Sequence, residues 1–441
     1  MNSTKPASAG GTRIARRTVL MGLGAGAASF YFPAAHASGS STIKIGWIAP
    51  MSGPGALFGI ATDFVHKQLD KLFSGGLEIG GKTYSVQIEL RDSRSDVNTA
   101  TQAAIGLMTS NKVDLIVASD AVAAIGAGRM AIVNKTPILS TILPADAVVG
   151  MLGGPKNYSN NGTPWNFHFC FASTDISETY LGMWSPYKAQ LDDKVAVSFV
   201  DQAAARGFAD PQHGLPAYLT KGGYQTVDGG MFKLGTSDFS NQVNLFKTSG
   251  CQILSGFMFA DNFAAFWRTA AQTGYKPEIA TVAGAFLFPG GIDALGDRGD
   301  GLSTEVWWSP KLPYHSTLTG QSAQALATQW ESAEQRQWTP VLGYTHAVWE
   351  VAVQALKSSG APGDSEALRK ALQNVDMETI IGKVDFAHSD IPGIAQTTLS
   401  GGQWRRRKGG KYKYELEIVY KGPKSPEGLE IEGDLTLLSK L

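Results

Sequence analysis

Short apolar runs alternate with segments whose apolar residues recur at helical spacing along most of the chain. Residues 84–90 alternate apolar and polar side chains, 97–111 show helical spacing, and 113–118 form a short apolar run. The same succession continues through 121–134 and 137–140. Repeated strand–helix units predict an α/β fold with mostly parallel sheets flanked by helices.

A polar segment at 150–164 separates this series from a second one, which runs from 166 to 274 with the same alternation. Later predicted elements are a strand at 304–308, helices at about 322–337 and 341–358, and strand-like segments at 412–419 and 429–438. If the first 37 of the 441 residues are set aside, 404 remain. A chain of this length exceeds one ordinary hydrophobic core, so two lobes are expected.

The stretch Ile43–Gly59, IKIGWIAPMSGPGALFG, has the pattern of a buried strand, a glycine-rich loop and a helix. In an open α/β sheet, such a loop lies at the carboxyl edge of the strands, where backbone N–H groups at a helix start can bind a polar or anionic group. The alternative is that Gly53, Gly55 and Gly59 only make a tight turn.

The first 37 residues have the features of an export signal that is removed from the mature protein. Arg16-Arg17 precede an apolar run, and Ala35-His36-Ala37 offers a small-residue cleavage site. The arginine pair resembles a twin-arginine signal, and the alternative is an ordinary secretory signal. The run is shorter than the roughly 20 residues of a membrane span. We therefore expect a periplasmic protein.

Charge and cysteine content exclude several classes of function. The chain has 38 basic and 38 acidic residues, and the first 37 contain four of the basic ones and no acid, so the remainder carries 34 against 38, a net charge of −4. This balance does not indicate nucleic-acid binding. Cys170 and Cys251 each lie in an apolar run. They could form a disulfide in an oxidising compartment or remain two buried thiols.

Sequence motifs that would indicate catalysis are either in the wrong structural context or absent. Residues 76–83 match the phosphate-binding pattern GxxxxGK[ST], but a predicted helix precedes them and a strand follows, the reverse of what that loop requires. The seven histidines are scattered, and neither HExxH nor GxSxG occurs. The sequence predicts no enzyme, no metal and no cofactor. His168 is expected in the core, although it could touch a ligand.

An ordered set of motifs carries a resemblance over nearly the whole chain after the signal. The motifs are IKIGWIAPMSGPGALFG, VQIELRDSRSDVNTATQAAIGLMTSNKVDLIVAS, KVAVSFVDQAAARGFAD, TSDFSNQVNLFKTSGCQILSGFMFADNFAAFWRTAAQTG, TPVLGYTHAVWEVAVQAL and IIGKVDF. In order and spacing they resemble the extracytoplasmic solute-binding proteins of ABC transporters, of the Leu/Ile/Val-binding type (periplasmic binding protein type I).

The resemblance implies two Rossmann-like lobes joined by a three-crossing hinge, with a small solute bound in the cleft between them. Lobe one would comprise 41–169 plus 310–378, and lobe two 170–309 plus 379–441. Closure around the solute would present the protein, expected as a monomer, to the membrane permease of an ABC importer. The alternative is a sensory protein of the same fold that reports the solute to a signalling partner.

The resemblance also implies ligand contacts, position by position: Ser52, Phe58, Ser119, Asp120, Ala121, Thr141, Ile142, Arg206, Asp261 and Ala283. Arg206 could hold a carboxylate, which favours an organic acid, or could pair with Asp201 or Asp261. Phe58, Phe259 and the Trp307-Trp308 pair favour an aromatic or amide-bearing acid, and the alternative is that these rings pack the hinge. Asp120 could hold an ammonium group or cap the next helix. Amino-acid binders of this family place an acidic residue near Ala283, so an α-amino acid is not favoured.

Overall fold

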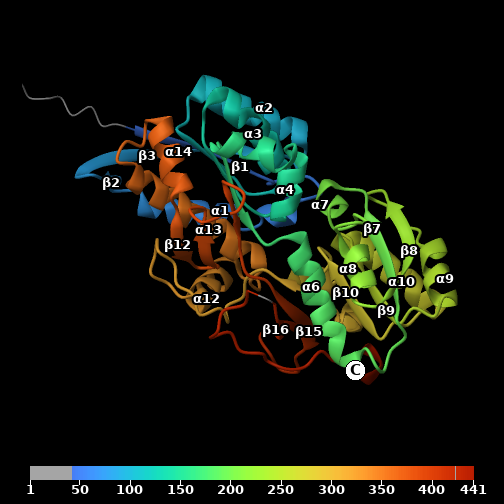
Figure 1. The fold of residues 1–441 in the computed structure, drawn as a ribbon. Coiled ribbons are helices and arrows are strands. Elements are labelled where there is room, and N and C mark those ends of the chain that lie inside the picture. Colours follow the sequence, from blue (N-terminus) through green and yellow to red (C-terminus); the bar gives the residue numbers. More distant parts are fainter. Residues whose placement is uncertain (1–41, 423) are drawn as a thin grey trace, which may run out of the picture. The chain divides into compact units, whose positions relative to one another are not determined.

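The computed structural model describes residues 42–422 and 424–441, and the predicted signal segment lies outside them. Within this part of the chain, the strands form two seven-stranded sheets and one two-stranded ribbon (Figure 1). Each large sheet has a parallel centre. This arrangement confirms the predicted α/β fold with two sheets flanked by helices.

The first sheet has the strand order β14-β6-β5-β4-β1-β3-β2. Its neighbouring strands are parallel, except that β2 and β3 form an antiparallel pair. The strands are β1 (Thr42–Ala49), β2 (Leu77–Ile79), β3 (Lys82–Asp92), β4 (Leu115–Ala118), β5 (Ile138–Ser140), β6 (Asn166–Cys170) and β14 (Ile394–Gln396). The central strands β1 and β4 are apolar on both faces, as a sheet covered by helices requires.

The second sheet has the order β16-β15-β11-β10-β9-β7-β8. Strands β7 to β11 pair in parallel, and β15 and β16 add an antiparallel edge. The strands are β7 (Lys194–Val200), β8 (Gln225–Phe232), β9 (Ile253–Phe257), β10 (Ile279–Ala283), β11 (Ser303–Val306), β15 (Ser400–Arg406) and β16 (Tyr414–Lys421). The separate ribbon pairs β12 (Asp376–Thr379) with β13 (Gly382–Asp385).

Helices connect most of the parallel strands. The α-helices are α1 (Thr62–Leu72), α2 (Val97–Gly106), α3 (Ala121–Asn134), α4 (Ala145–Met151), α5 (Gly154–Tyr158), α6 (Ser173–Trp184), α7 (Ala203–Arg206), α8 (Leu215–Lys221), α9 (Ser240–Thr248), α10 (Ala260–Thr273), α11 (Pro289–Asp293), α12 (Ala323–Glu334), α13 (Pro340–Ser359) and α14 (Ser365–Gln373). Single-turn or short irregular helices are η1 (Ala56–Gly59), η2 (Leu107–Asn111), η3 (Asn160–Gly162), η4 (Ser185–Tyr187), η5 (Gly296–Gly299) and η6 (Leu438–Lys440).

The chain passes between the two sheets three times: after β6, after β11 and after β14. The third crossing corrects the predicted boundary at 378/379, because β14 still pairs with β6 in the first sheet. The chain enters the second sheet only between Gln396 and Ser400. The three-residue strand β14 is too short to show the alternation from which strands are predicted.

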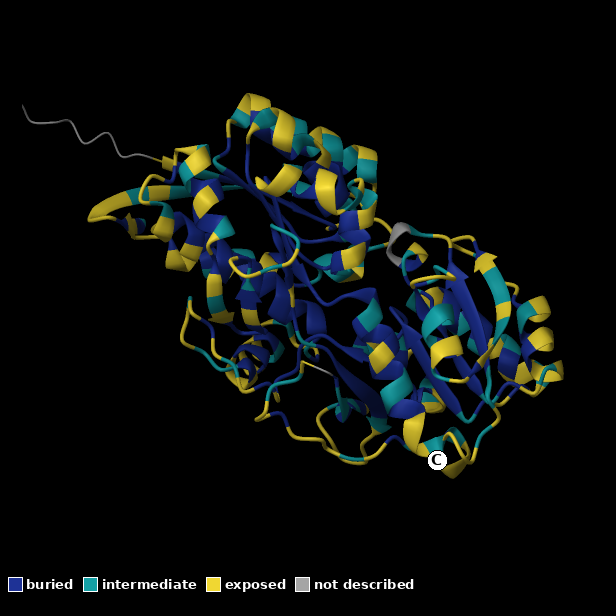
Figure 2. Ribbon diagram, viewed as in Figure 1, coloured by how far each residue is buried: buried dark blue, intermediate teal, exposed yellow. Residues whose placement is uncertain are grey.

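Helix α13 is buried on nearly all sides and lies beside elements almost 300 residues away in sequence. It contacts α1, β2, β4 and β5, and Figure 1 shows it in orange among the blue elements of the first sheet. The rings of Trp47 on β1 and Trp349 on α13 meet edge to face, with centroids 5.0 Å apart. Figure 2 shows the same pattern, with buried strands inside and exposed residues on the outer helix faces.

The structure also tests the predictions for the glycine-rich match at 76–83 and for the two cysteines. Residues 76–83 comprise β2, the Gly80-Gly81 turn and the start of β3 rather than a phosphate loop, because a strand follows them, as their context indicated. Cys170 and Cys251 are both buried and free, which settles the alternatives in favour of two thiols.

The predicted strand at 429–438 is wrong, because this segment pairs with no strand in the described chain. Among the described residues, no helix combines the length and apolar character that a membrane span requires.

Candidate functional site

A cavity of about 310 Å³ is lined by residues from both sheets. Nearly all of its lining follows the carboxyl ends of strands, which is where open α/β sheets place their ligands. The lining residues are Pro54, Gly55, Phe58, Ser95, Asp120, Ala121, Val122, Ile142, Leu143, Pro144, Phe171, Ile176, Gln202, Leu234, Phe257, Phe259, Glu305 and Trp307. We call this space the inner cavity.

The loop after β1 is fixed to the loop after β3. Asp92 accepts hydrogen bonds from the backbone N–H groups of Met51 and Ser52 at 3.0 and 3.2 Å, and from the Ser52 hydroxyl at 2.6 Å. Gly53 has φ +86°, and a Cβ there would lie 2.4 Å from the carbonyl oxygen of Arg94. Close approach of two loops therefore explains the glycine-rich sequence. Ser52 holds this loop and does not line the cavity.

Asp120 begins helix α3 and lines the cavity from the first sheet. Its Oδ1 accepts the backbone N–H of Ala123 at 2.7 Å, and its Oδ2 accepts the Ser93 hydroxyl at 3.3 Å. The side chain is 6% exposed. Burial raises the pKa of Asp120 to about 7, against the lowering effect of these hydrogen bonds. Asp120 therefore caps α3 and also places a carboxyl group at the cavity wall.

The loop after β5 has a strained backbone at the cavity. Ile142 has φ +65°, a conformation that β-branched residues rarely adopt. The Thr141 hydroxyl donates to the carbonyl oxygen of Phe169 at 2.8 Å, and His168 Nε2 lies 2.7 Å from the carbonyl oxygen of Leu143. Burial lowers the pKa of His168 to about 4, so its neutral ring donates from Nε2. These buried bonds hold Ile142 at the wall.

Glu305, on β11, is the carboxyl group that the second sheet brings to the cavity. Its Oε2 accepts hydrogen bonds from the Tyr180 hydroxyl and, at 2.9 Å, from the Thr304 hydroxyl. Its Oε1 has only the backbone N–H of Gly284, at 3.4 Å, among the described residues. Glu305 is 1% exposed, and burial raises its pKa above the ordinary value.

Aromatic rings form the remaining wall. Phe58 lies nearly parallel to Trp307, with centroids 6.0 Å apart, and meets Phe259 edge to face at 6.5 Å. Trp307 also contacts Phe171 at 5.2 Å. Trp307 directly follows the end of β11, two residues after Glu305, and both residues line the cavity. The cavity thus combines an aromatic surface with two buried carboxyl groups.

The structure brings four of the ten sequence-predicted site residues to the cavity: Phe58, Asp120, Ala121 and Ile142. Ser119 and Thr141 are buried and do not line it; the Ser119 hydroxyl accepts the indole N–H of Trp47 at 2.9 Å. Ala283 is fully buried at the end of β10.

Two charged residues predicted in the second lobe lie away from the inner cavity. Arg206 is exposed and donates to Asp201 from Nε at 3.1 Å and from Nη2 at 2.9 Å, which is one of the two alternatives predicted for it. Asp261 is also exposed and lines a different cavity. Arg206 is therefore not among the described residues that line the inner cavity.

Several lining residues were not predicted as site residues, including Ser95, Phe171, Gln202 and Glu305. Glu305 had a readable signal, because an acidic residue inside the buried strand pattern STEVWW is unusual. The resemblance implied a contact at the neighbouring strand end, Ala283, instead of at Glu305. The others depend on loop geometry that spacing does not predict.

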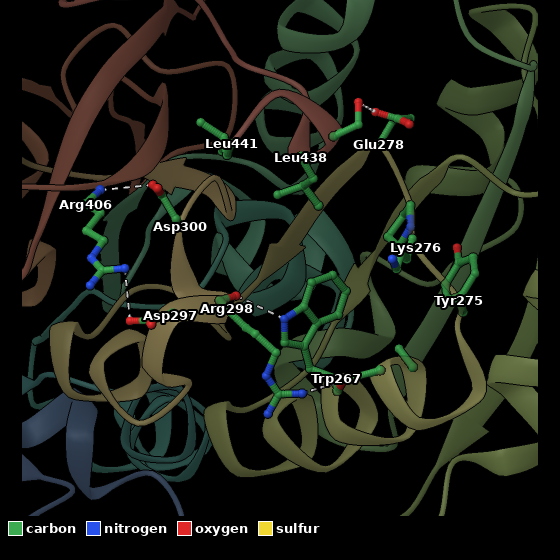
Figure 3. A pocket seen from close by; sticks show the side chains of 14 residues that line it. Trp267, Tyr275, Lys276, Glu278, Asp297, Arg298, Asp300, Arg406, Leu438 and Leu441 are labelled. Atoms are coloured by element: carbon green, nitrogen blue, oxygen red, sulfur yellow. Dashed lines mark hydrogen bonds and ion pairs between the residues drawn. The ribbon is translucent and has the colours of Figure 1, made fainter.

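A second cavity, of about 580 Å³, lies at the opposite edge of the second sheet (Figure 3). Its wall includes residues just before β10 and β11, at the amino ends of these strands. Arg406 Nη1 pairs with Asp297 at 3.1 Å, and its backbone N–H donates to Asp300 at 2.9 Å. We call this space the outer cavity. Its position at the amino ends of the strands and the exposed Arg406–Asp297 pair on its wall make it the weaker candidate.

One group of described residues has the composition of a cation site. Asp376, Asp385 and His388 place ligand atoms within 4.8 Å of one another. Lys383 Nζ lies 3.1 Å from Asp376 and 3.2 Å from Asp385, so a lysine already pairs with both carboxylates. This group is explained as a surface ion-pair cluster.

Residues 42–410 match the model of the family described as periplasmic binding protein, so the chain belongs to that family. The match covers every strand of the two large sheets except β16 and includes all the residues that line the inner cavity. The family is one of binding proteins rather than enzymes.

Solved structures share the fold at low sequence identity. The leucine binding protein LivK of Thermotoga maritima has a TM-score of 0.67 at 19% identity, over 86% of this chain and 99% of that one. A solute binding protein of an ABC transporter from Rhodopseudomonas palustris, in complex with 3,4-dihydroxybenzoic acid, gives 0.67 at 19%, over 87% and 99%. LivJ of Streptococcus pneumoniae, in complex with isoleucine, gives 0.66 at 17%, over 86% and 100%.

Proposed function

We propose that this chain is the substrate-binding protein of an ABC importer, which captures a small organic solute in the inner cavity and delivers it to a membrane permease. The two sheets, with the helices packed on them, act as two lobes. A solute that contacts both lobes favours their closed arrangement, since binding shifts a conformational equilibrium by its differential affinity. The permease then recognises the closed form.

The observation that carries this proposal is that residues from both sheets line the inner cavity. Asp120 and Ile142 come from loops of the first sheet, and Gln202 and Glu305 come from the second. The volume of about 310 Å³ suits a small molecule, and the wall combines apolar surface with a few polar groups. Membership of the family and the transporter proteins among the similar structures support the same function.

The proposal includes export to the periplasm. The features of residues 1–37 support a cleaved signal, and Arg16-Arg17 supports the twin-arginine route. The mature protein acts as a monomer that meets its permease transiently.

The test is native mass spectrometry of the mature protein, purified without refolding, followed by thermal shifts with a panel of small organic solutes. A solute that binds only the native state raises the melting temperature, and the rise grows with the logarithm of the ratio of its concentration to its Kd. We expect a co-purified small molecule, or at least one stabilising solute from the panel. A protein that carries no solute and that no panel member stabilises would contradict the proposed function.

A further inference from the structure

We propose that the inner cavity selects an organic cation, an amine or ammonium compound with an apolar body, rather than a carboxylate. This inference rests on the proposed function and specifies its solute class. It is carried by two buried carboxyl groups, one from each sheet, and by the aromatic wall between them. The compounds bound in two of the similar structures, 3,4-dihydroxybenzoic acid and isoleucine, carry carboxyl groups.

Glu305 has an acceptor site available for a ligand. A carboxylate offers about four lone-pair sites. Oε2 receives two hydroxyl donors, Tyr180 and Thr304, whereas Oε1 receives only the long bond from Gly284 at 3.4 Å among the described residues. An ammonium N–H at the cavity can therefore donate to Oε1 without displacing a protein donor.

Asp120 offers a similar oxygen from the opposite sheet. Its Oδ1 is committed to capping α3 through Ala123, but Oδ2 has only the 3.3 Å bond from Ser93. The same carboxyl group disfavours an anion at the start of α3, because a ligand carboxylate near the N–H groups of Ala121 and Val122 would meet Asp120 at close range. Asp120 therefore turns a helix start suited to anions into a site for a hydrogen-bond donor.

The charges around the cavity agree with this assignment. None of the described lining residues is a lysine, arginine or histidine. None of the main influences on the pKa of Asp120 or of Glu305 is a basic side chain. Arg206, the cation that favoured an organic acid, is exposed and paired with Asp201. A buried carboxylate without a partner is costly, and a cationic ligand supplies the missing countercharge.

The aromatic rings suit the rest of such a ligand. Phe58, Phe171, Phe259 and Trp307 form a continuous set of ring contacts at the wall. Aromatic faces attract organic cations through the ring quadrupole, and tryptophan does so most strongly. The same rings bury the apolar part of an amine. The aromatic wall thus suits both the cationic group and the apolar part of the ligand.

The experiment is calorimetric titration of the mature protein at pH 8 with three probes that share one ring: benzylamine, benzamide and benzoate. Choline and L-isoleucine extend the set. We expect benzylamine to bind at least about tenfold more tightly than benzamide, and benzoate not to bind. The isosteric variants Glu305→Gln and Asp120→Asn should each weaken benzylamine binding by about tenfold or more and leave benzamide binding within threefold. Thermal unfolding of each variant confirms that it is folded.

Arg206→Ala is the matched control and should bind benzylamine like wild type. Tighter binding of benzoate or L-isoleucine than of benzylamine would overturn the cation assignment and leave the proposed function standing. Tighter binding of benzamide would overturn it in favour of a neutral solute. Absence of any amine binding would also overturn it. Failure of the proposed function itself is separate, because that requires that no solute of any charge binds.

Discussion

The inner and outer cavities differ in how they hold charge. In the outer cavity, Arg406 and Asp297 pair while 43% and 72% of their side chains remain exposed. In the inner cavity, Asp120 and Glu305 are 6% and 1% exposed and face no basic side chain in the described chain. Exposed ion pairs contribute little to the free energy of unfolding, so the pair in the outer cavity does not require a ligand to explain it. Buried carboxyl groups without a counterion are costly, and a ligand is the partner that accounts for them.

Substitutions that fill one cavity or the other should give the largest difference in solute affinity. Leu234→Trp adds a large side chain at the rim of the inner cavity, and we expect solute affinity to fall by about 100-fold or more, because the cavity volume is lost. Ala271→Trp makes the same change at the exposed wall of the outer cavity and should leave affinity unchanged. Calorimetry with benzylamine measures both. Loss of binding in Ala271→Trp alone would reverse the assignment of the two cavities.

Solute binding should also depend on pH in a direction set by Asp120. Burial raises its pKa from 3.8 to about 7, and its nearby groups are the Ser93 hydroxyl, the Ala123 N–H and the charge of Asp92. A cation binds the ionised form, so benzylamine affinity should rise about tenfold between pH 6 and pH 8. Asp120→Asn should flatten this profile. An affinity that falls with rising pH would show that the ligand prefers the protonated carboxyl group.

The same raised pKa predicts the stability of the empty protein. Because the folded state binds the Asp120 proton more tightly than the unfolded state does, its contribution to stability decreases as pH rises from about 4 to about 7. The melting temperature of wild type relative to Asp120→Asn should therefore fall across this window. A difference that stays constant with pH would place Asp120 in contact with water.

Removing a charge at the outer cavity should have a smaller effect. Arg406→Gln breaks an exposed ion pair with Asp297 and retains the backbone bond to Asp300. We expect a loss of about 0.2–1 kcal/mol in the free energy of unfolding, measured by urea denaturation, and no change in solute affinity. A loss above about 3 kcal/mol would mean that this pair is a buried structural element rather than a surface one.

The smallest expected effect is that of Arg206→Ala. The Arg206–Asp201 pair is 66% and 46% exposed, so stability should change by less than about 1 kcal/mol. Affinity for benzylamine and for benzoate should remain within twofold of wild type. A carboxylate that stabilises wild type but not this variant would restore the organic-acid hypothesis.

Sequence patterns predicted the fold well because the alternation of buried strands and helices is long and regular. The parallel centres of both sheets follow from it, and so does the turn at 76–83. The third crossing was placed too early because β14 has only three residues, whose partners are chosen by tertiary packing. The segment 429–438 has strand-like composition but pairs with no strand in the described chain.

The site was predicted more successfully on the first sheet than on the second. Phe58, Asp120 and Ile142 follow directly after strands or sit in the first loop, so strand ends locate them. In the second sheet, the acidic group comes from within β11 rather than from the end of β10. Side-chain direction along β11, and not the order of loops, brings Glu305 to the cavity. Spacing alone does not reveal that direction.

The most direct test of this account is a crystal structure of the mature protein with benzylamine. The account predicts the amine in the inner cavity, with its nitrogen within hydrogen-bond distance of Glu305 Oε1 or Asp120 Oδ2 and its ring against Phe58 and Trp307. A ligand in the outer cavity, or an amine in the inner cavity whose nitrogen points away from both carboxyl groups, would contradict it.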